Sequence, residues 1–118
     1  MPVADVLNER ELGRYAHRVA ERWPLDRVLV GGARIDDARG VLPQRERGAD
    51  FVVILVSAGF DGVPWLERVH QAGSLWDASE MRGPADVHCY TPAEFERKRT
   101  ALPVVQWAAE RGLELALD

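Results

Sequence analysis

Apolar residues near the start of the chain recur at the spacing of one helix face. They are Leu12, Tyr15, Ala16, Val19, Ala20 and Trp23. Asn8 precedes them and Glu11 stands three residues after it, which is the arrangement of an N-cap residue and its reciprocal partner. Pro24 is expected to stop the helix. This part of the chain therefore predicts one amphipathic helix.

Three apolar runs predict strands. Arg27–Val30 is a short run that leads into Gly31 and Gly32, as a strand leads into a tight turn. Phe51–Val56 is uniformly apolar and rich in valine, which is typical of a strand covered on both faces. Ala85–Tyr90 is partly polar and predicts a third strand.

A second helix is indicated in the middle of the chain. Pro64 suits the first position of a short helix that runs through His70. Gly73 is expected to end that helix. The following stretch, Ser74–Gly83, gives no definite prediction.

The last third of the chain predicts two more helices and a short strand. Thr91–Glu94 combines a capping threonine, a proline and a glutamate, and predicts a helix to about Arg99. Another helix is expected over Pro103–Arg111, ending at Gly112. Leu113–Leu117 can then close the sheet as a short edge strand.

The segment Ala33–Ala49 has no sustained periodicity. It predicts a long charged loop, the most mobile internal segment of the chain. We see no repeat and no linker, so residues 1–118 are expected to form a single domain. The order of elements is that of an α+β or an α/β domain.

Composition narrows the class of protein. The chain has 118 residues, is 47% hydrophobic and carries a formal charge of −4, which excludes a disordered or fibrous protein. The mild acidity argues against strong nucleic-acid binding through phosphate neutralisation, but not against a nucleotide bound through a metal ion. Cys89 is the single cysteine, and no run approaches the about 18 apolar residues of a membrane span. We therefore expect a cytoplasmic protein without a membrane segment.

The order of motifs resembles the minimal nucleotidyltransferases of the DNA polymerase beta-like superfamily. In that family a hydrophobic strand leads into paired small residues, then a loop leads to an Asp-x-Asp strand, and a later strand carries a third aspartate. The matching segments here are Val28–Gly32, Asp50–Val52 and Asp86–Val87. Asp86–Phe95 and Gly112–Leu115 also resemble the third strand with its following helix and the closing strand of the family. The resemblance covers the chain from about Glu11 onward. It implies the α+β class, with a small mixed β-sheet and helices packed against it.

The resemblance implies a nucleotide site. Asp50 and Asp86 would be the catalytic residues and the ligands of Mg²⁺, which prefers oxygen ligands. Gly31 and Gly32 would let the backbone approach the phosphates of ATP or another nucleoside triphosphate. Arg34 would also bind the nucleotide. Each motif has an ordinary structural interpretation as well, as a strand-ending turn or an acidic strand end.

Other residues are weaker candidates. The loop residues Arg39, Arg45 and Arg47 can meet phosphates or form a solvated charged surface. His88 alternates with Asp86 along one strand face and can line the same cleft. Cys89 is expected to be a small buried apolar residue. The tryptophans fit core or amphipathic positions and indicate no ligand.

Position 52 departs from the family pattern. Val52 stands where the second carboxylate of the Asp-x-Asp pair is expected, so efficient two-metal catalysis is expected to be lost. The loop between Gly32 and Asp50 is seventeen residues long, and Asp36 or Asp37 within it can in principle replace the missing ligand.

Three functions remain open from the sequence. The leading one is a degenerate, inactive nucleotidyltransferase-like domain that serves as a nucleotide-binding or protein-interaction and regulatory module. The resemblance implies as partner a helical nucleotide-binding-domain protein, in an antitoxin-like role, or a second copy of the chain. The alternatives are an active Mg²⁺-dependent nucleotidyltransferase and a structural homodimer without a ligand.

Overall fold

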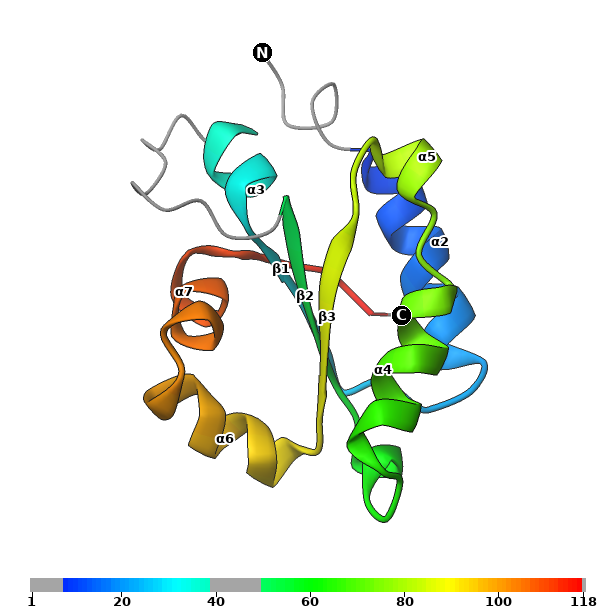
Figure 1. The fold of residues 1–118 in the computed structure, drawn as a ribbon, viewed down its shortest axis with the longest axis vertical. Helices are drawn as coiled ribbons and strands as arrows, with labels where there is room; N and C mark the ends of the chain where they lie inside the picture. The colour runs from blue at the N-terminus through cyan, green and yellow to red at the C-terminus, as the bar shows by residue number, and fades with distance from the viewer. Residues whose placement is uncertain (1–7, 39–49, 118) are drawn as a thin grey trace.

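Four strands of the described residues form one mixed sheet in the order β3-β2-β1-β4 (Figure 1). The computed structural model describes residues 8–38 and 50–117. Strand β1 (Arg27–Gly31) pairs antiparallel with β2 (Phe51–Val56), and β2 pairs parallel with β3 (Ala85–Tyr90). Strand β4 (Leu113–Glu114) pairs antiparallel with β1. This mixed sheet with packed helices confirms the predicted α+β class.

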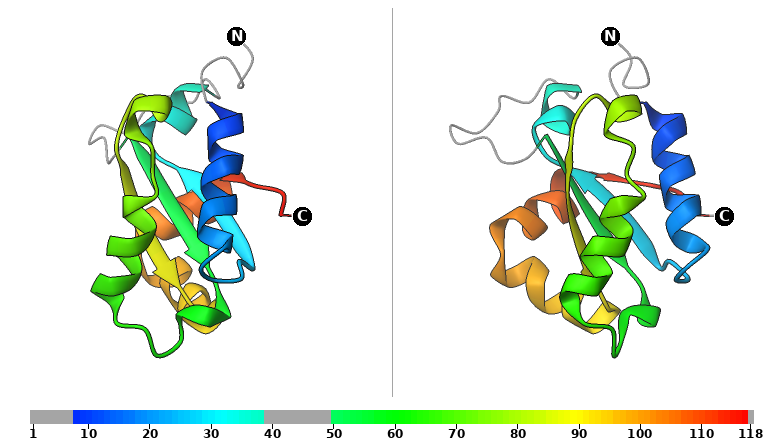
Figure 2. Two further views of the ribbon diagram at one scale, coloured as in Figure 1. Left: turned by 90° about the vertical axis from the view of Figure 1, so that its right-hand side faces the viewer. Right: turned by 45° about the vertical axis from the view of Figure 1, so that its right-hand side comes forward.

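Helices α2 (Glu9–Ala20) and α4 (Trp65–Ser74) lie side by side on one face of the sheet (Figure 2). A 3-10 turn, η1 (Ala58–Phe60), follows β2 and adds the buried Phe60 to this layer. The sheet contributes every second residue of its strands to this core. From helix α2 come Leu12, Tyr15 and Val19, and from the strands come Val28, Val30, Phe51, Val53, Leu55, Val87 and Cys89.

Helices α6 (Pro92–Ala101) and α7 (Pro103–Arg111) cover the opposite face. The alternate residues of the strands pack there, in a second buried cluster of Leu29, Val52, Ile54, Val56, Tyr90, Phe95, Val105 and Ala108. All six residues of β2 are buried because both of its faces are covered. The uniformly apolar run had predicted this arrangement.

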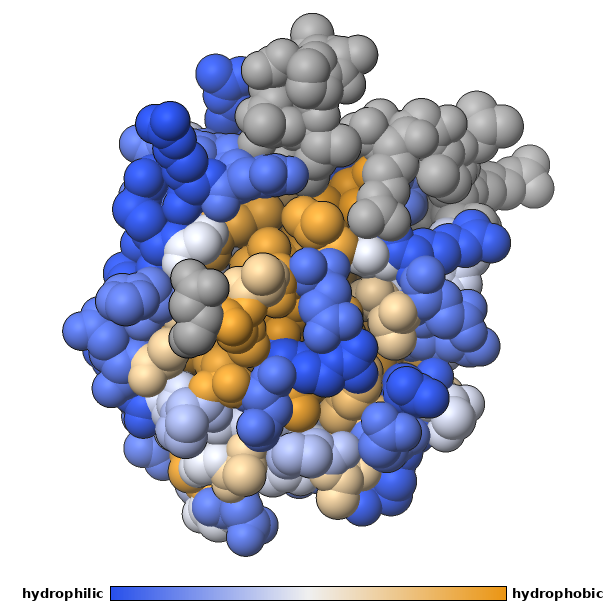
Figure 3. Space-filling view, turned by 180° about the vertical axis from the view of Figure 1, so that it is seen from behind, coloured by the Kyte–Doolittle hydropathy of each residue, from blue (hydrophilic) through white to orange (hydrophobic). Residues whose placement is uncertain are grey.

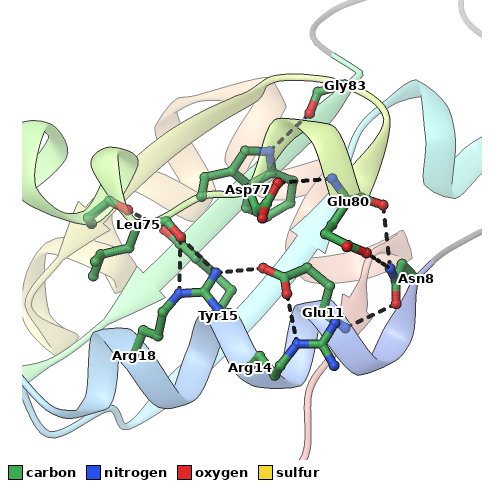
Figure 4. A network of polar contacts seen from close by, with 11 residues as sticks. Asn8, Glu11, Arg14, Tyr15, Arg18, Leu75, Asp77, Glu80 and Gly83 are labelled. Carbon is green, nitrogen blue, oxygen red and sulfur yellow. Dashed lines mark hydrogen bonds and ion pairs between the residues drawn. The ribbon is translucent and has the colours of Figure 1, made fainter.

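Capping side chains fix where the helices begin. Thr91 and Glu94 form the complete capping box predicted for α6. Asn8 caps α2 as predicted and accepts a hydrogen bond from the Glu11 amide. The expected reciprocal role of Glu11 is wrong, because its buried carboxylate binds Arg14 and Arg18 instead (Figure 4).

The predicted loop is partly helical. Helix α3 (Ala33–Ala38) begins directly after Gly32, so the loop prediction is wrong for these residues. The physical reason is burial, since Ile35 is only 1% exposed and anchors the turn in the core. Residues 39–49 lie outside the described residues, and their predicted mobility stays a prediction.

One other boundary differs from the prediction, and one short helix was not predicted. Helix α4 continues through Gly73 to Ser74, where a side chain on Gly73 would meet nothing within 4 Å. The stretch that gave no definite prediction contains a short helix, α5 (Ala78–Met81). Gly112 ends α7 as expected, yet its φ is −73°. It is required for space, because a Cβ there would collide with the carbonyl oxygens of Ala108 and Val30.

The rear surface of the molecule is apolar in its middle and hydrophilic around it (Figure 3). The C-terminal segment that follows α7 runs on this side, and its Leu113 and Leu115 are partly buried against the core. Only two residues of this segment pair with β1, so the predicted edge strand is shorter than Leu113–Leu117. No helix in residues 8–38 and 50–117 is both long and apolar enough to cross a membrane.

Candidate functional site

Gly31, Val52 and Asp86 lie side by side on three neighbouring strands. Gly31 is the register partner of Val52 across the antiparallel pair, and Val52 is the partner of Asp86 across the parallel pair. Asp50 directly precedes β2, and Gly32 directly follows β1. The strand register therefore brings the five residues to one end of the sheet, on the side where the resemblance places a nucleotide.

The two glycines are required for different reasons. A Cβ on Gly31 would lie 3.2 Å from the Cβ of Ala108, so this glycine lets α7 approach the strand closely. Gly32 has a φ of 105°, a conformation that residues with a side chain rarely adopt. It turns the chain from β1 into α3. Both glycines thus have a structural role, and that role leaves a compact backbone turn at this end of the sheet.

Asp50 lies against the turn before β3. Its Oδ2 is 3.8 Å from Nη2 of Arg34, and the two side chains are 43% and 30% exposed. Gly83 packs so closely on Asp50 that a Cβ at this glycine would lie 2.7 Å from the same oxygen. The carboxylate therefore points towards Arg34 and Gly83.

Arg34 already has partners within the fold. Its Nη2 also donates to the carbonyl of Arg82, and its guanidinium lies over the Phe51 ring, 5.6 Å from the centroid. It thereby connects α3 with the turn that follows α5. To bind a nucleotide, the guanidinium would have to exchange one of these contacts for a phosphate. The nucleotide-binding role of Arg34 remains a prediction.

Asp86 belongs to a hydrogen-bonded chain along β3. Its Oδ2 is 3.1 Å from Nε2 of His88, and Nδ1 of that histidine is 2.8 Å from the hydroxyl of Tyr90. A carboxylate only accepts hydrogen bonds, so in neutral His88 the proton sits on Nε2 and the tyrosine donates to Nδ1. Burial, followed by the negative charges of Asp86 and Glu94, raises the pKa of Tyr90 to about 12. The tyrosine thus keeps the proton that it donates.

Trp65 extends this chain at the surface. Its ring lies 5.3 Å from the Tyr90 ring at an interplanar angle of 32°, and 6.3 Å from the His88 ring. Trp65 is 42% exposed, whereas Tyr90 beneath it is 3% exposed. The alternation of Asp86, His88 and Tyr90 along β3 is visible in the sequence, so these three neighbours could be predicted to share one face of the strand. Trp65 could not be found in this way, because only tertiary packing brings α4 to β3.

The described residues do not fit a two-metal centre. Val52 is 3% exposed within the apolar cluster and offers no oxygen between Asp50 and Asp86. In the part of the chain that the structure describes, no group of three or more histidine, cysteine or acidic side chains is placed to hold a metal ion. Asp36 is half-buried on α3. The side chain of Asp37, together with Arg39, Arg45 and Arg47, lies outside the described residues.

The remaining candidates have structural surroundings. Cys89 is fully buried, as predicted, and burial raises the pKa of its thiol to about 12. His17 and His70 lie on exposed positions of α2 and α4. His88, by contrast, faces Asp86 as the strand alternation predicted.

Comparison with solved structures gives one fold relationship. The crystal structure of a candidate nucleotidyltransferase from Sulfolobus solfataricus superimposes with a TM-score of 0.51 and 19% sequence identity, covering 75% of this chain and 70% of that chain. No protein-family model matches the sequence. The curated proteins contain no match either. The chain therefore has a nucleotidyltransferase-like fold, as the resemblance predicted.

Proposed function

We propose that this chain is a degenerate nucleotidyltransferase-like domain that binds a nucleotide without transferring it and acts as a binding or regulatory module. The observation that carries the proposal is the position of Val52. It lies between Gly31 and Asp86, where the family has a carboxylate, and it is buried among apolar side chains. A buried valine cannot bridge two metal ions, whereas the neighbouring backbone turn and the sheet end are retained.

The nucleotide would meet three features at this end of the sheet. Gly31 and Gly32 supply a compact turn, and Arg34 supplies a positive charge that is 30% exposed. Asp50 and Asp86 would bind at most one Mg²⁺ that accompanies the phosphates and keeps most of its own water. Such a cation would assist binding and would not activate an attacking hydroxyl.

Thermal unfolding with ATP and GTP, each with and without Mg²⁺, tests the proposal. A ligand that binds the native state raises the melting temperature by mass action. We expect a shift that persists without Mg²⁺, and no incorporation of labelled nucleotide into any acceptor. A shift that requires Mg²⁺, together with metal-dependent transfer, would instead establish an active enzyme. No shift with either nucleotide would refute nucleotide binding.

A second candidate function is protein interaction in an antitoxin-like arrangement with a helical partner. Leu102, which directly precedes α7, and Val104, within α7, are 37% and 39% exposed. Neighbouring exposed apolar side chains are typical of contact surfaces. Leu66 on α4 is 77% exposed but belongs to a helix on the opposite face of the sheet. Sedimentation analysis over a range of concentrations tests the simplest form, a homodimer, and a purely monomeric protein would leave only a different chain as partner.

A further inference from the structure

A half-exposed indole rests on a rigid support at the surface of β3. Trp65 is the first residue of α4, and its ring packs on that of Tyr90 with an interplanar angle of 32°. Tyr90 is fixed from below, since it is 3% exposed and bonds His88 through its hydroxyl. A ring that is supported on one side and 42% exposed presents a flat apolar surface without needing to reorganise.

Hydrogen-bond acceptors and donors adjoin this flat surface. Beyond Tyr90 along the same face of β3 come His88, whose side chain is 14% exposed, and Asp86, whose side chain is 57% exposed. The Asp86 carboxylate can accept further hydrogen bonds besides the one from His88. A ligand that fits this surface has an aromatic ring for the indole at one end, and at the other end the phosphate-bound cation proposed above for the carboxylate. A phosphate does not fit on the indole itself, because the face of that ring carries no positive charge.

The direction of β3 relates this surface to the glycine turn. Asp86 lies on the same rung of the sheet as Gly31, and Tyr90 lies four residues further along the strand, about 13 Å away. A nucleotide stretched along β3 with its phosphates near Gly32 would therefore bring its ring system towards Trp65. The two ends of such a ligand meet surfaces of matching chemistry.

We infer that Trp65, supported by Tyr90, is the stacking platform for the base of the bound nucleotide. This inference rests on the proposed nucleotide binding. It names the part of the ligand that this surface recognises. Stacking of a base on an aromatic side chain contributes enough that truncation to alanine weakens binding by about 5- to 100-fold.

Calorimetric titration of Trp65→Ala with ATP and with inorganic tripolyphosphate tests the inference. We expect the variant to bind ATP about 5- to 100-fold more weakly than the wild type. Binding of tripolyphosphate should be unchanged, because it has no base. Trp65→Phe should retain most of the ATP affinity. Trp107→Ala is the matched control and should leave ATP affinity unchanged. It removes another partly exposed indole, which lies on α7 and packs against the Arg111 guanidinium, away from Tyr90.

Two outcomes separate the inference from the function beneath it. If the wild type binds ATP and Trp65→Ala binds it equally well, the platform is refuted and nucleotide binding stands. Equal affinity of the wild type for ATP and tripolyphosphate would refute the platform in the same way. If the wild type binds neither compound, the proposed function fails and the platform fails with it. The melting temperature of each variant shows whether the comparison is between folded proteins.

Discussion

Val52 and Asp86 are register partners on the adjacent parallel strands β2 and β3. In a parallel pair such partners project from the same face of the sheet. A carboxylate at position 52 would therefore stand beside that of Asp86, which is where a shared metal ion would bind. The valine instead joins the apolar layer under α6 and α7.

Introducing a carboxylate tests the role proposed for this position. Val52→Asp is expected to raise the affinity for Mg²⁺, because it adds a second negatively charged oxygen ligand next to Asp86. Without metal the variant should be less stable than the wild type by roughly 3 kcal/mol or more, since it buries a charge near another acid. Magnesium calorimetry and denaturant unfolding measure the two effects. The wild type should show no nucleotide transfer above background.

Val52→Asn is the matched control for this change. It has nearly the shape of aspartate but no charge, so it should lose stability without gaining Mg²⁺ affinity. If Val52→Asp binds Mg²⁺ no better than the wild type, Asp50 and Asp86 do not form part of a cation site. Metal-dependent transfer by the wild type would overturn the inactive interpretation.

Of the two neighbouring glycines, Gly32 has the backbone conformation that disfavours any residue with a side chain. Its φ of 105° predicts that Gly32→Ala destabilises the fold by about 1–3 kcal/mol. Gly13→Ala is the control, because Gly13 lies inside helix α2 with nothing within 4 Å of an added Cβ. That change should stabilise the protein by roughly 0.5–1 kcal/mol. Urea unfolding of both variants checks the signs, and equal effects would contradict the backbone argument.

How far the sequence predicts this fold depends on the range of the interactions involved. The buried run of β2 and the capping box at Thr91 are local patterns, and both were predicted with their positions. Helix α3 was missed because its six residues carry too short a period to stand out, and burial of Ile35 holds it. The contact of Trp65 with Tyr90 was missed because it joins residues of two separate elements.

Stability in acid should depend on Glu94. Its carboxylate accepts a hydrogen bond from buried Arg68, and this bond, ahead of those from Thr91, lowers the pKa of Glu94 below its usual 4.5. A carboxyl group whose pKa is lower in the folded state stabilises the fold above its unfolded pKa. That contribution is lost as the pH falls from about 4.5 through the lower folded value.

Glu94→Gln removes the titration and keeps an oxygen for the Thr91 amide. The free energy of unfolding of the wild type should fall more steeply below about pH 4.5 than that of the variant. Denaturant unfolding at several pH values between neutral and acid compares the slopes. Identical slopes for the two proteins would show that the bond to Arg68 does not contribute to the pH dependence.

Arg18 joins two helices that the sequence places far apart. It binds the buried carboxylate of Glu11 at 2.5 Å and donates through Nη2 to the carbonyl of Leu75 at 2.7 Å, so it connects α2 to the end of α4 (Figure 4). Arg14 binds the same carboxylate at 2.9 Å but its side chain is 55% exposed, against 32% for Arg18. The two arginines thus share one acid and differ in their other contacts.

Alanine at each position separates these contacts. Arg18→Ala should lower the free energy of unfolding by about 1–3 kcal/mol, because it leaves a buried carboxylate with one partner fewer and the Leu75 carbonyl without this donor. Arg14→Ala should cost at most about 1 kcal/mol, because the Arg14 side chain is largely exposed and Arg18 still pairs with the Glu11 carboxylate. Urea unfolding at neutral pH measures both. Equal losses would mean that the bond to Leu75 adds nothing to the attachment of α2 to α4, which also includes the hydrogen bond from the Tyr15 hydroxyl to the Ala72 carbonyl.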